Sequence, residues 1–391
     1  MNQEFRLAKG WAIFAWIILP VFMVLVGALG VMPFFKDEFN WVLAIILVPI
    51  SLLLEFVGIM AIMELIKGKL IISNDRITIV EAFKTKTLLF TDIKGYRQIQ
   101  GYLTFFPIDQ QKKKIKANTY YGNSARLLAW VYQNFKDLDH EETINDEQEI
   151  FKNEEYGRTS KERKNKLKKA KKITKILNIS AWVVAAFLWF YPEFYKIQIM
   201  LCALIPIIGL IVMNRSKGLI RLDEKTNSAR PNILSTVFIP SLALLIRSSK
   251  DCEIFDYSNF WNYAIVICLI LFIMVVKELK ENYNFKQGTT YVALIGFLMF
   301  GAMYTYGLII TSNLAFNDNE PSAYKTEVLE KRISTGKHTS YYLKIDKWGP
   351  QNEIEEVSVS KSMYEKKKIG DSAIVYFNTG ALDIPYYMVV D

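Results

Sequence analysis

The sequence predicts a polytopic α-helical membrane protein with about seven transmembrane helices and two β modules. Of the 391 residues, 51% are hydrophobic, and they are gathered into blocks separated by charged stretches. Most blocks approach the roughly 20 residues that a helix needs to cross a hydrocarbon core. Two other segments instead alternate apolar and polar residues, as strands do. We therefore expect one β module inserted after the second helix and a small all-β module at the C-terminus.

The first two apolar blocks, residues 11–31 and 41–63, predict a pair of transmembrane helices within region 1–66. The first block is longer than the roughly 7–15 residues of a signal-peptide core, so we expect an uncleaved helix. Trp11 and Trp41 stand at the block edges, where aromatic rings prefer the membrane interface.

Five more apolar blocks lie in region 176–311. They are residues 176–191, 197–213, 233–246, 260–276 and 290–311. The block 233–246 is short and contains Pro240. It therefore fits a full span, a tilted half-span or a re-entrant segment, and these alternatives stay open.

Residues 67–140 have the pattern of a β module. KLIISNDRITIVEAF alternates on both sides of Asn74-Asp75, which predicts a hairpin, and further short strands follow. Residues 125–135 have apolar side chains at helical spacing, and Asn123-Ser124 is an expected N-terminal cap. The order is strands first and one amphipathic helix last.

This module, over residues of about 69–140, resembles the bacterial pleckstrin-homology-like domain. The resemblance is carried by the hairpin LIISNDRITI, the strand FTDIKGYR, the closing helix ARLLAWVYQNF and the preceding pair of transmembrane helices. It implies a strongly bent sheet closed by one helix. It also implies a domain that binds a ligand or partner and carries out no catalysis.

The remaining polar segments are a linker and a C-terminal module. Residues 141–157 hold seven Asp or Glu, whereas 158–175 hold ten Lys or Arg and one acid. Region 141–175 is therefore expected to be a solvated, partly helical linker, acidic and then basic. Residues 312–391 contain five short strand patterns separated by turn residues, which predict a small β-barrel or sandwich.

Basic residues in the short loops predict the orientation. They concentrate in the N-terminus, the run 158–175, the loop 214–232 and the segment after residue 276. Because positive loops stay in the cytoplasm, the N-terminus and the inserted module are expected to be cytoplasmic and the C-terminal module extracytoplasmic. The expected location is a bacterial inner (cytoplasmic) membrane, crossed several times.

Two basic clusters are candidate contacts for membrane lipids, anionic ones in particular. The candidate residues are Lys112, Lys113, Lys114, Lys116, Lys164, Lys168 and Lys172. Two other interpretations stay open. The first cluster fits a solvated hairpin edge that discourages strand pairing. The second fits a determinant of topology.

Glu55 lies near the middle of the second span, where a charge is costly and is a functional candidate by default. It fits an ion or proton site, or a hydrogen-bonding carboxyl that joins two helices. The two histidines have no partner at metal-ligand spacing, and no nucleophile or phosphate-loop motif is present. We therefore expect no metal, no cofactor and no catalytic residues.

These observations favour a non-catalytic scaffold or sensor whose inserted module binds lipid or an unknown protein partner. A transporter or channel subunit that uses Glu55 is the alternative, and an intramembrane enzyme is the third possibility. Nucleic acid is not an expected partner, because no motif presents the net charge of +9 to it.

Overall fold

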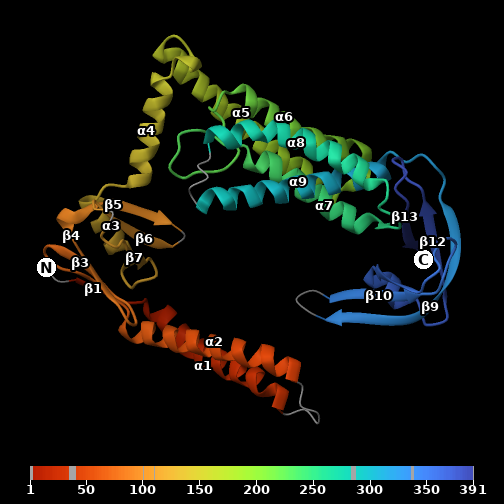
Figure 1. The fold of residues 1–391 in the computed structure, drawn as a ribbon, viewed down its shortest axis with the longest axis horizontal. Helices are drawn as coiled ribbons and strands as arrows, with labels where there is room; N and C mark the ends of the chain where they lie inside the picture. Colours follow the sequence, from red (N-terminus) through yellow and green to blue (C-terminus); the bar gives the residue numbers. More distant parts are fainter. Residues whose placement is uncertain are drawn as a thin grey trace. The chain divides into compact units, whose positions relative to one another are not determined.

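The computed structural model describes residues 3–34, 41–99, 101–109, 111–282, 288–335 and 339–390. The chain forms two compact units (Figure 1). Unit 1 is Met1–Asn145 with Thr226–Ser228, and unit 2 is Asp146–Lys225 with Ala229–Asp391. Each unit combines membrane-type helices with a β-sheet module.

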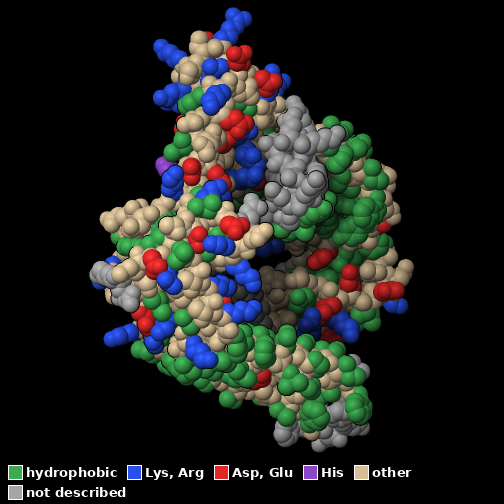
Figure 2. Space-filling view, turned by 60° about the vertical axis from the view of Figure 1, so that its left-hand side comes forward, with side chains coloured by type: hydrophobic (Ala, Val, Ile, Leu, Met, Phe, Trp, Pro, Cys, Tyr) green, Lys and Arg blue, Asp and Glu red, His purple; other side chains and the backbone are tan. Residues whose placement is uncertain are grey.

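Unit 1 contains a helical hairpin formed by α1 (Lys9–Val31) and α2 (Trp41–Lys67), and the turn η1 (Met32–Phe34) follows α1. Both predicted helices are confirmed. Most of their large apolar side chains are exposed. Figure 2 shows these hydrophobic side chains, in green, at the bottom of the view. A surface of this kind is suited to lipid and not to water.

The two hairpin helices approach closely at glycines. A Cβ atom on Gly30 would lie 2.7 Å from the Ser51 hydroxyl oxygen, and one on Gly58 would lie 2.9 Å from the Met23 Cγ. Small residues at such contacts let two helix backbones pack without a large side chain between them.

The β module of unit 1 consists of two antiparallel sheets and a closing helix. The first sheet has the order β1 (Gln3–Phe5), β2 (Lys69–Ile72), β3 (Arg76–Val80), β4 (Thr85–Leu89). The second has β5 (Ile93–Ile99), β6 (Tyr102–Pro107) and β7 (Ile115–Asn118). A short turn, η2 (Phe90–Asp92), joins the two sheets, and α3 (Ser124–Asn134) follows them.

The predicted hairpin at Asn74-Asp75 is confirmed, because Ile72 pairs with Ile77 across it. Helix α3 buries Leu127 and Val131 in the core of the module. The expected side-chain cap is wrong: Asn123 holds the N-cap position with a left-handed φ of 57° and makes no capping side-chain bond.

The acidic and basic segments are more regular than the expected linker. The acidic part forms α4 (Leu138–Lys152) and the short turn η3 (Glu154–Tyr156). The basic run continues without a break into the next apolar block as α5 (Ser160–Phe190). Thr159 and Glu162 form a capping box at its start, which fixes where the helix begins.

Unit 2 continues with four more long helices. After the turn η4 (Pro192–Phe194) these are α6 (Tyr195–Arg215), α7 (Leu234–Asp251), α8 (Phe260–Asn282) and α9 (Gly288–Ala315). Across the described residues of both units, five helices are long and apolar enough to cross a membrane: α1, α2, α5, α6 and α9. The apolar part of α8 is shorter. The protein is thus an α-helical membrane protein with β modules, and length and composition support five of the seven expected spans.

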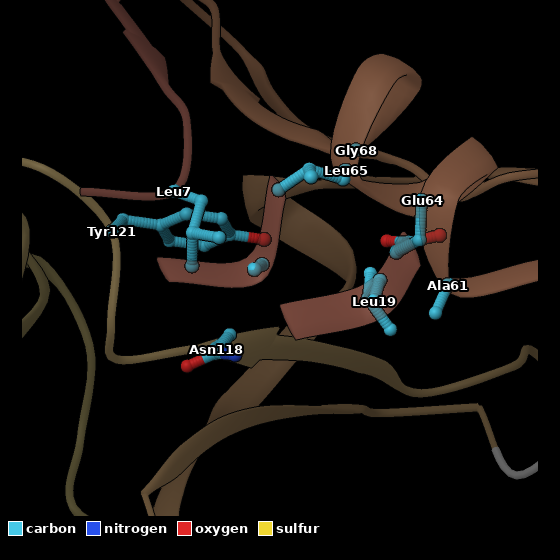
Figure 3. Close-up of a pocket in the computed structure, with 9 residues that line it drawn as sticks. Leu7, Leu19, Ala61, Glu64, Leu65, Gly68, Asn118 and Tyr121 are labelled. Carbon is cyan, nitrogen blue, oxygen red and sulfur yellow. The ribbon is translucent and has the colours of Figure 1, made fainter. Parts of the chain in front are cut away.

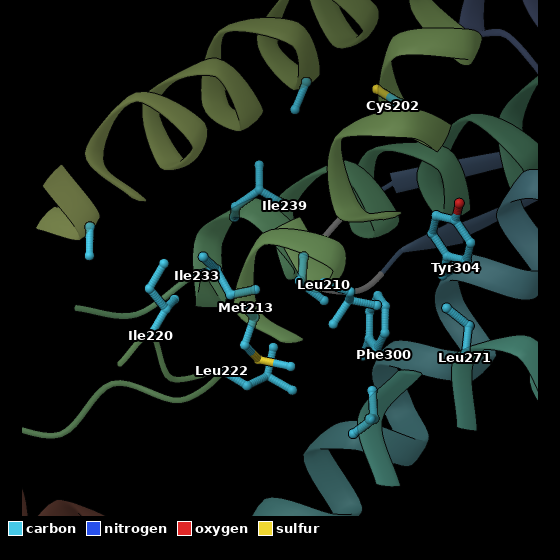
Figure 4. Packing of buried hydrophobic residues seen from close by; sticks show 14 of the residues in the cluster. Cys202, Leu210, Met213, Ile220, Leu222, Ile233, Ile239, Leu271, Phe300 and Tyr304 are labelled. Atoms are coloured by element: carbon cyan, nitrogen blue, oxygen red, sulfur yellow. The ribbon is translucent and has the colours of Figure 1, made fainter. Parts of the chain in front are cut away.

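Helix α7, the short block 233–246 of the sequence, lies at the centre of the bundle. It packs against α5, α6 and α9 and runs as one continuous helix through Pro240. Buried Thr236, Ser241 and Ser248 lie on it. A helix surrounded by protein needs less apolar surface than one that faces lipid, which explains its modest hydrophobicity. Figure 4 shows Ile239 of this helix in the bundle core with Leu210 of α6.

The C-terminal module is one open, bent antiparallel sheet. Its order is β11 (Glu355–Val359), β10 (Thr339–Ile345), β9 (Ser322–Thr335), β12 (Ser372–Asn378), β13 (Tyr386–Val390), β8 (Glu253–Ile254). Five strands match the prediction. In the described residues the sheet does not close into a barrel, and it gains β8 from the α7–α8 connection and the small helix α10 (Lys361–Lys366).

Candidate functional site

Two adjoining pockets lie where the α1–α2 hairpin meets the β module of unit 1, and together we call them the junction pocket. The first has a volume of about 270 Å³ (Figure 3), and it is lined by Leu7, Ala15, Leu19, Ala61, Glu64, Leu65, Gly68, Asn118 and Tyr121. The second, of about 320 Å³, shares four of these residues and adds Trp11, Phe14, Ile18 and Tyr120.

The α1–α2 hairpin is joined directly to the first sheet of the β module. Strand β1 precedes α1, strand β2 follows α2, and the two strands pair antiparallel. The Ala8 N–H donates to the Tyr120 carbonyl at 3.0 Å, and the Gly122 N–H donates to the Arg6 carbonyl at 2.8 Å. These bonds fix the first turn of α1 against the module, and so they fix the walls of the pocket.

Three side chains form the polar end of the junction pocket. One oxygen of the Glu64 carboxylate accepts a hydrogen bond from the Ala82 N–H at 2.6 Å. The Asn118 Oδ1 accepts one from the Tyr120 N–H at 2.7 Å. Within the part of the chain that the structure describes, the other Glu64 oxygen and the Asn118 Nδ2 group have no hydrogen-bonding partner.

Tyr121 completes this polar end. In Figure 3 its hydroxyl points toward the Glu64 carboxylate from the opposite side of the pocket. Burial raises the pKa of Tyr121 to about 12. The phenol therefore keeps its proton at neutral pH and can donate a hydrogen bond into the pocket.

The rest of the pocket is mostly apolar, and its rim is formed by aromatic rings. The ring centroids of Trp11 and Tyr120 are 5.4 Å apart, and those of Trp11 and Phe14 are 5.9 Å apart. All three side chains are about half exposed. Aromatic residues gather at the interface between lipid and water, so this rim is suited to that depth.

The first lysine cluster lies away from the junction pocket. Lys112 forms an ion pair with Asp92 at 2.7 Å, whereas Lys113 is exposed. The Lys114 and Lys116 ammonium groups lie 5.8 Å and 4.0 Å from the ring centroids of Phe106 and Tyr102. The turn at residues 112–114 joins β6 to β7 at one end of these two strands. Gly101 lies at the other end, where its carbonyl accepts a hydrogen bond from the Thr119 N–H beside α1.

The second cluster forms a stripe on α5. Lys164, Lys168 and Lys172 are exposed and recur every four residues, so they share one helix face. The opposite face buries Leu167 and Ala170. Figure 2 shows basic side chains, in blue, at the top of the view, where α5 begins in Figure 1.

Glu55 faces the partner helix of the hairpin. One of its carboxylate oxygens lies 3.4 Å from the position that a Cβ atom on Gly27 would take. The side chain is half-buried and lines neither part of the junction pocket. Among the described residues it has no hydrogen-bond or ion-pair partner.

Sequence reasoning missed the junction pocket, because its walls come from residues more than a hundred positions apart. The one available signal was Glu64, a carboxylate one turn before the end of an apolar helix. The described ranges contain no group of three or more His, Cys, Asp or Glu side chains placed to hold a metal ion. Comparison of the chain with protein-family models, with curated proteins and with solved structures gives no match.

Proposed function

We propose that the protein is a non-catalytic membrane scaffold or sensor whose inserted module, residues 67–140, works as a recognition module at the membrane surface. The pairing of β1 with β2 on the two sides of the helical hairpin carries this proposal. A module joined to the membrane by its own sheet keeps a fixed orientation toward the lipid. Such an arrangement suits a module that recognises what lies at the surface.

The architecture of this module supports its resemblance to pleckstrin-homology-like domains. A four-stranded and a three-stranded antiparallel sheet are followed by the single helix α3, which packs into their common core. A domain of that class binds a lipid or a protein partner, and this is the role that we propose here.

We also propose seven spans, with α7 and α8 added to the five most apolar helices, in a bacterial inner membrane. In unit 2 the loop after α6 contacts η3, just before α5, since the Tyr156 hydroxyl donates to the Lys217 carbonyl at 2.9 Å. The connection between α7 and α8 instead joins the C-terminal sheet through β8. With the basic end cytoplasmic, the C-terminal module is extracytoplasmic.

Cysteine labelling tests this topology. In a Cys268→Ser background, Gln111→Cys and Pro350→Cys should react with a membrane-impermeant maleimide from opposite sides of sealed vesicles. Cys202 and Cys252 are buried and should stay unlabelled in both variants. Labelling of both positions from one side would contradict an odd number of spans between them.

We propose that the α5 stripe contacts anionic lipid. With a rise of 1.5 Å per residue, Lys172, Lys168 and Lys164 lie about 6, 12 and 18 Å before Ile176, where the apolar part begins. Electrostatic attraction is screened over roughly 8–10 Å at physiological salt. The contribution of each lysine should therefore fall with its distance from the membrane.

Single Lys→Gln variants of the full chain in vesicles of phosphatidylcholine and phosphatidylglycerol test this gradient. The phosphatidylglycerol that co-purifies with the protein should fall most for Lys172→Gln, less for Lys168→Gln and little for Lys164→Gln. Lys361→Gln, in the C-terminal module, is the control. Equal losses at all three positions, or none, would overturn the lipid role of the stripe.

The position of Glu55 favours a role in helix packing over a role in transport. Glu55 packs against Gly27 of the partner helix and lines neither part of the junction pocket. We therefore put forward no transport function for it.

A further inference from the structure

The junction pocket lies at the start of α1 and the end of α2, two helices that are long and apolar enough to cross a membrane. Trp11 stands at its rim, and Leu19, eight residues further along α1, lies about 12 Å deeper. Ala15 and Leu19 belong to a helix that is long and apolar enough to cross a membrane. An occupant that fills the pocket from the membrane side must therefore be polar at one end and apolar at the other.

The polar groups of the pocket define the headgroup. The free Glu64 oxygen is a negatively charged acceptor, which matches an N–H donor that carries positive charge. The Asn118 Nδ2 group and the Tyr121 hydroxyl are donors, which match phosphate or ester oxygens. An ammonium group and a phosphate in one small headgroup satisfy both requirements.

We propose that the junction pocket binds one zwitterionic phospholipid with a primary ammonium group, such as phosphatidylethanolamine. Glu64 accepts hydrogen bonds from the ammonium, and Asn118 and Tyr121 donate to the phosphate or ester oxygens. This inference rests on the proposed position of the module at the membrane surface and names the lipid that it recognises.

The same chemistry excludes the obvious competitors. A choline headgroup carries positive charge but has no N–H group, so it cannot donate to Glu64. A free phosphate or an anionic headgroup would meet the Glu64 carboxylate without an ammonium to compensate it. The volumes of about 270 and 320 Å³ suit a headgroup and the first part of a chain, and together they fall within the usual range for ligand pockets.

The test uses the full chain in nanodiscs that contain phosphatidylcholine, phosphatidylethanolamine and phosphatidylglycerol in equal amounts. Lipids that remain with the protein after transfer to detergent are quantified by mass spectrometry. We expect phosphatidylethanolamine to be retained roughly tenfold over phosphatidylcholine, as one charge-assisted hydrogen bond allows. Glu64→Gln should bring this ratio close to one, because glutamine still accepts from Ala82 but carries no charge.

Ala61→Phe fills the apolar wall and should reduce the retained phosphatidylethanolamine severalfold. Val57→Phe is its matched control, since Val57 lies one turn earlier on α2, is exposed and does not line the pocket. An unfolding temperature for Glu64→Gln equal to that of the native chain shows that the fold is intact.

Two results would overturn the inference: no preference in the native chain, or a preference that Glu64→Gln leaves unchanged. A preference for phosphatidylglycerol that depends on Lys172 and not on Glu64 would also overturn it, while it would support the lipid role of the α5 stripe. The failure of the pocket and the failure of the wider proposal are therefore distinguishable.

Discussion

Asn313, in the last turn of α9, lies directly against Gly380 of the C-terminal module. The Asn313 Nδ2 group donates to the Ile384 carbonyl at 2.8 Å, and its Oδ1 accepts from the Leu382 N–H at 2.8 Å. The side chain is only 1% exposed. One buried amide thus holds the 380–384 segment against the end of α9. The C-terminal module is therefore packed on this helix as well as covalently linked to it.

Asn313→Ala should destabilise the protein by about 2–4 kcal/mol, because it leaves the Leu382 N–H and the Ile384 carbonyl buried without partners. Thermal unfolding of the full chain in detergent measures the effect. Asn319→Ala is the control, since Asn319 makes an exposed 3.4 Å contact with Thr379 and its loss should matter little. Equal effects of the two substitutions would contradict the docking role of Asn313.

Gly380→Ala should be more harmful than Gly370→Ala, although both glycines have a positive φ, of 75° and 89°. A Cβ atom on Gly380 would lie 2.2 Å from the Asn313 amide, whereas on Gly370 the nearest atom is 3.9 Å away. Each substitution carries backbone strain of about 1–2 kcal/mol, and only the first displaces Asn313. The unfolding temperature of Gly380→Ala should therefore be lower than that of Gly370→Ala. Gly296→Ala, in open space on α9, should not lower the unfolding temperature.

Gly30→Ala should weaken the α1–α2 hairpin by about 1–3 kcal/mol, because the added methyl group meets Ser51. Ser51→Ala should restore stability only in part, since the Ser51 Cβ itself would lie 2.8 Å from the new atom. Ser51→Gly should restore more. Thermal unfolding of the double variants checks this order, and Gly10→Ala, with no neighbour within 4 Å, is the neutral control. Full rescue by Ser51→Ala would show that the contact geometry is wrong.

Glu253 should make the protein less stable as the pH rises. Partial desolvation, and then the negative charge of Glu355, raise the pKa of this carboxyl above its ordinary value of 4.5. The folded state therefore holds the proton more tightly than the unfolded state, and stability falls as the pH increases from 4.5 through the folded pKa. Glu253→Gln should raise the unfolding temperature at pH 7–8, by about 1–2 °C, and have no effect below pH 4.5.

Glu356→Gln provides a control of opposite sign. A hydrogen bond from Arg332 lowers the pKa of Glu356, so its contribution is present above pH 4.5 and is lost as the pH falls. This substitution should lower the unfolding temperature slightly at neutral pH. If both variants shift stability in the same direction, the assignment of Glu253 is incorrect.

Local signals in the sequence predicted most of the elements. Apolar blocks specify helices wherever the solvent is lipid, and Asn74-Asp75 specifies a hairpin through its own turn chemistry. Strands β1 and β8 were missed because they are three and two residues long and pair with partners far along the chain. Strands this short have no periodicity of their own.

The candidate site was predicted less well for the same physical reason. The lysines stand out as charge runs in the sequence, whereas Asn118 and Tyr121 become pocket residues only when β7 is placed beside α1. Helix α7 was the weakest prediction, since hydrophobicity measures exposure to lipid and α7 is enclosed by protein.

Because α5 is one unbroken helix, a tilt of its apolar part also displaces its basic part. From Ser160 to Lys175 the helix extends for about 24 Å before its apolar part begins. A tilt of the apolar part by about 10° would therefore move Ser160 sideways by about 4 Å if the helix stays straight. Changes in bilayer thickness that alter helix tilt would thus become displacements of the α4–α5 turn.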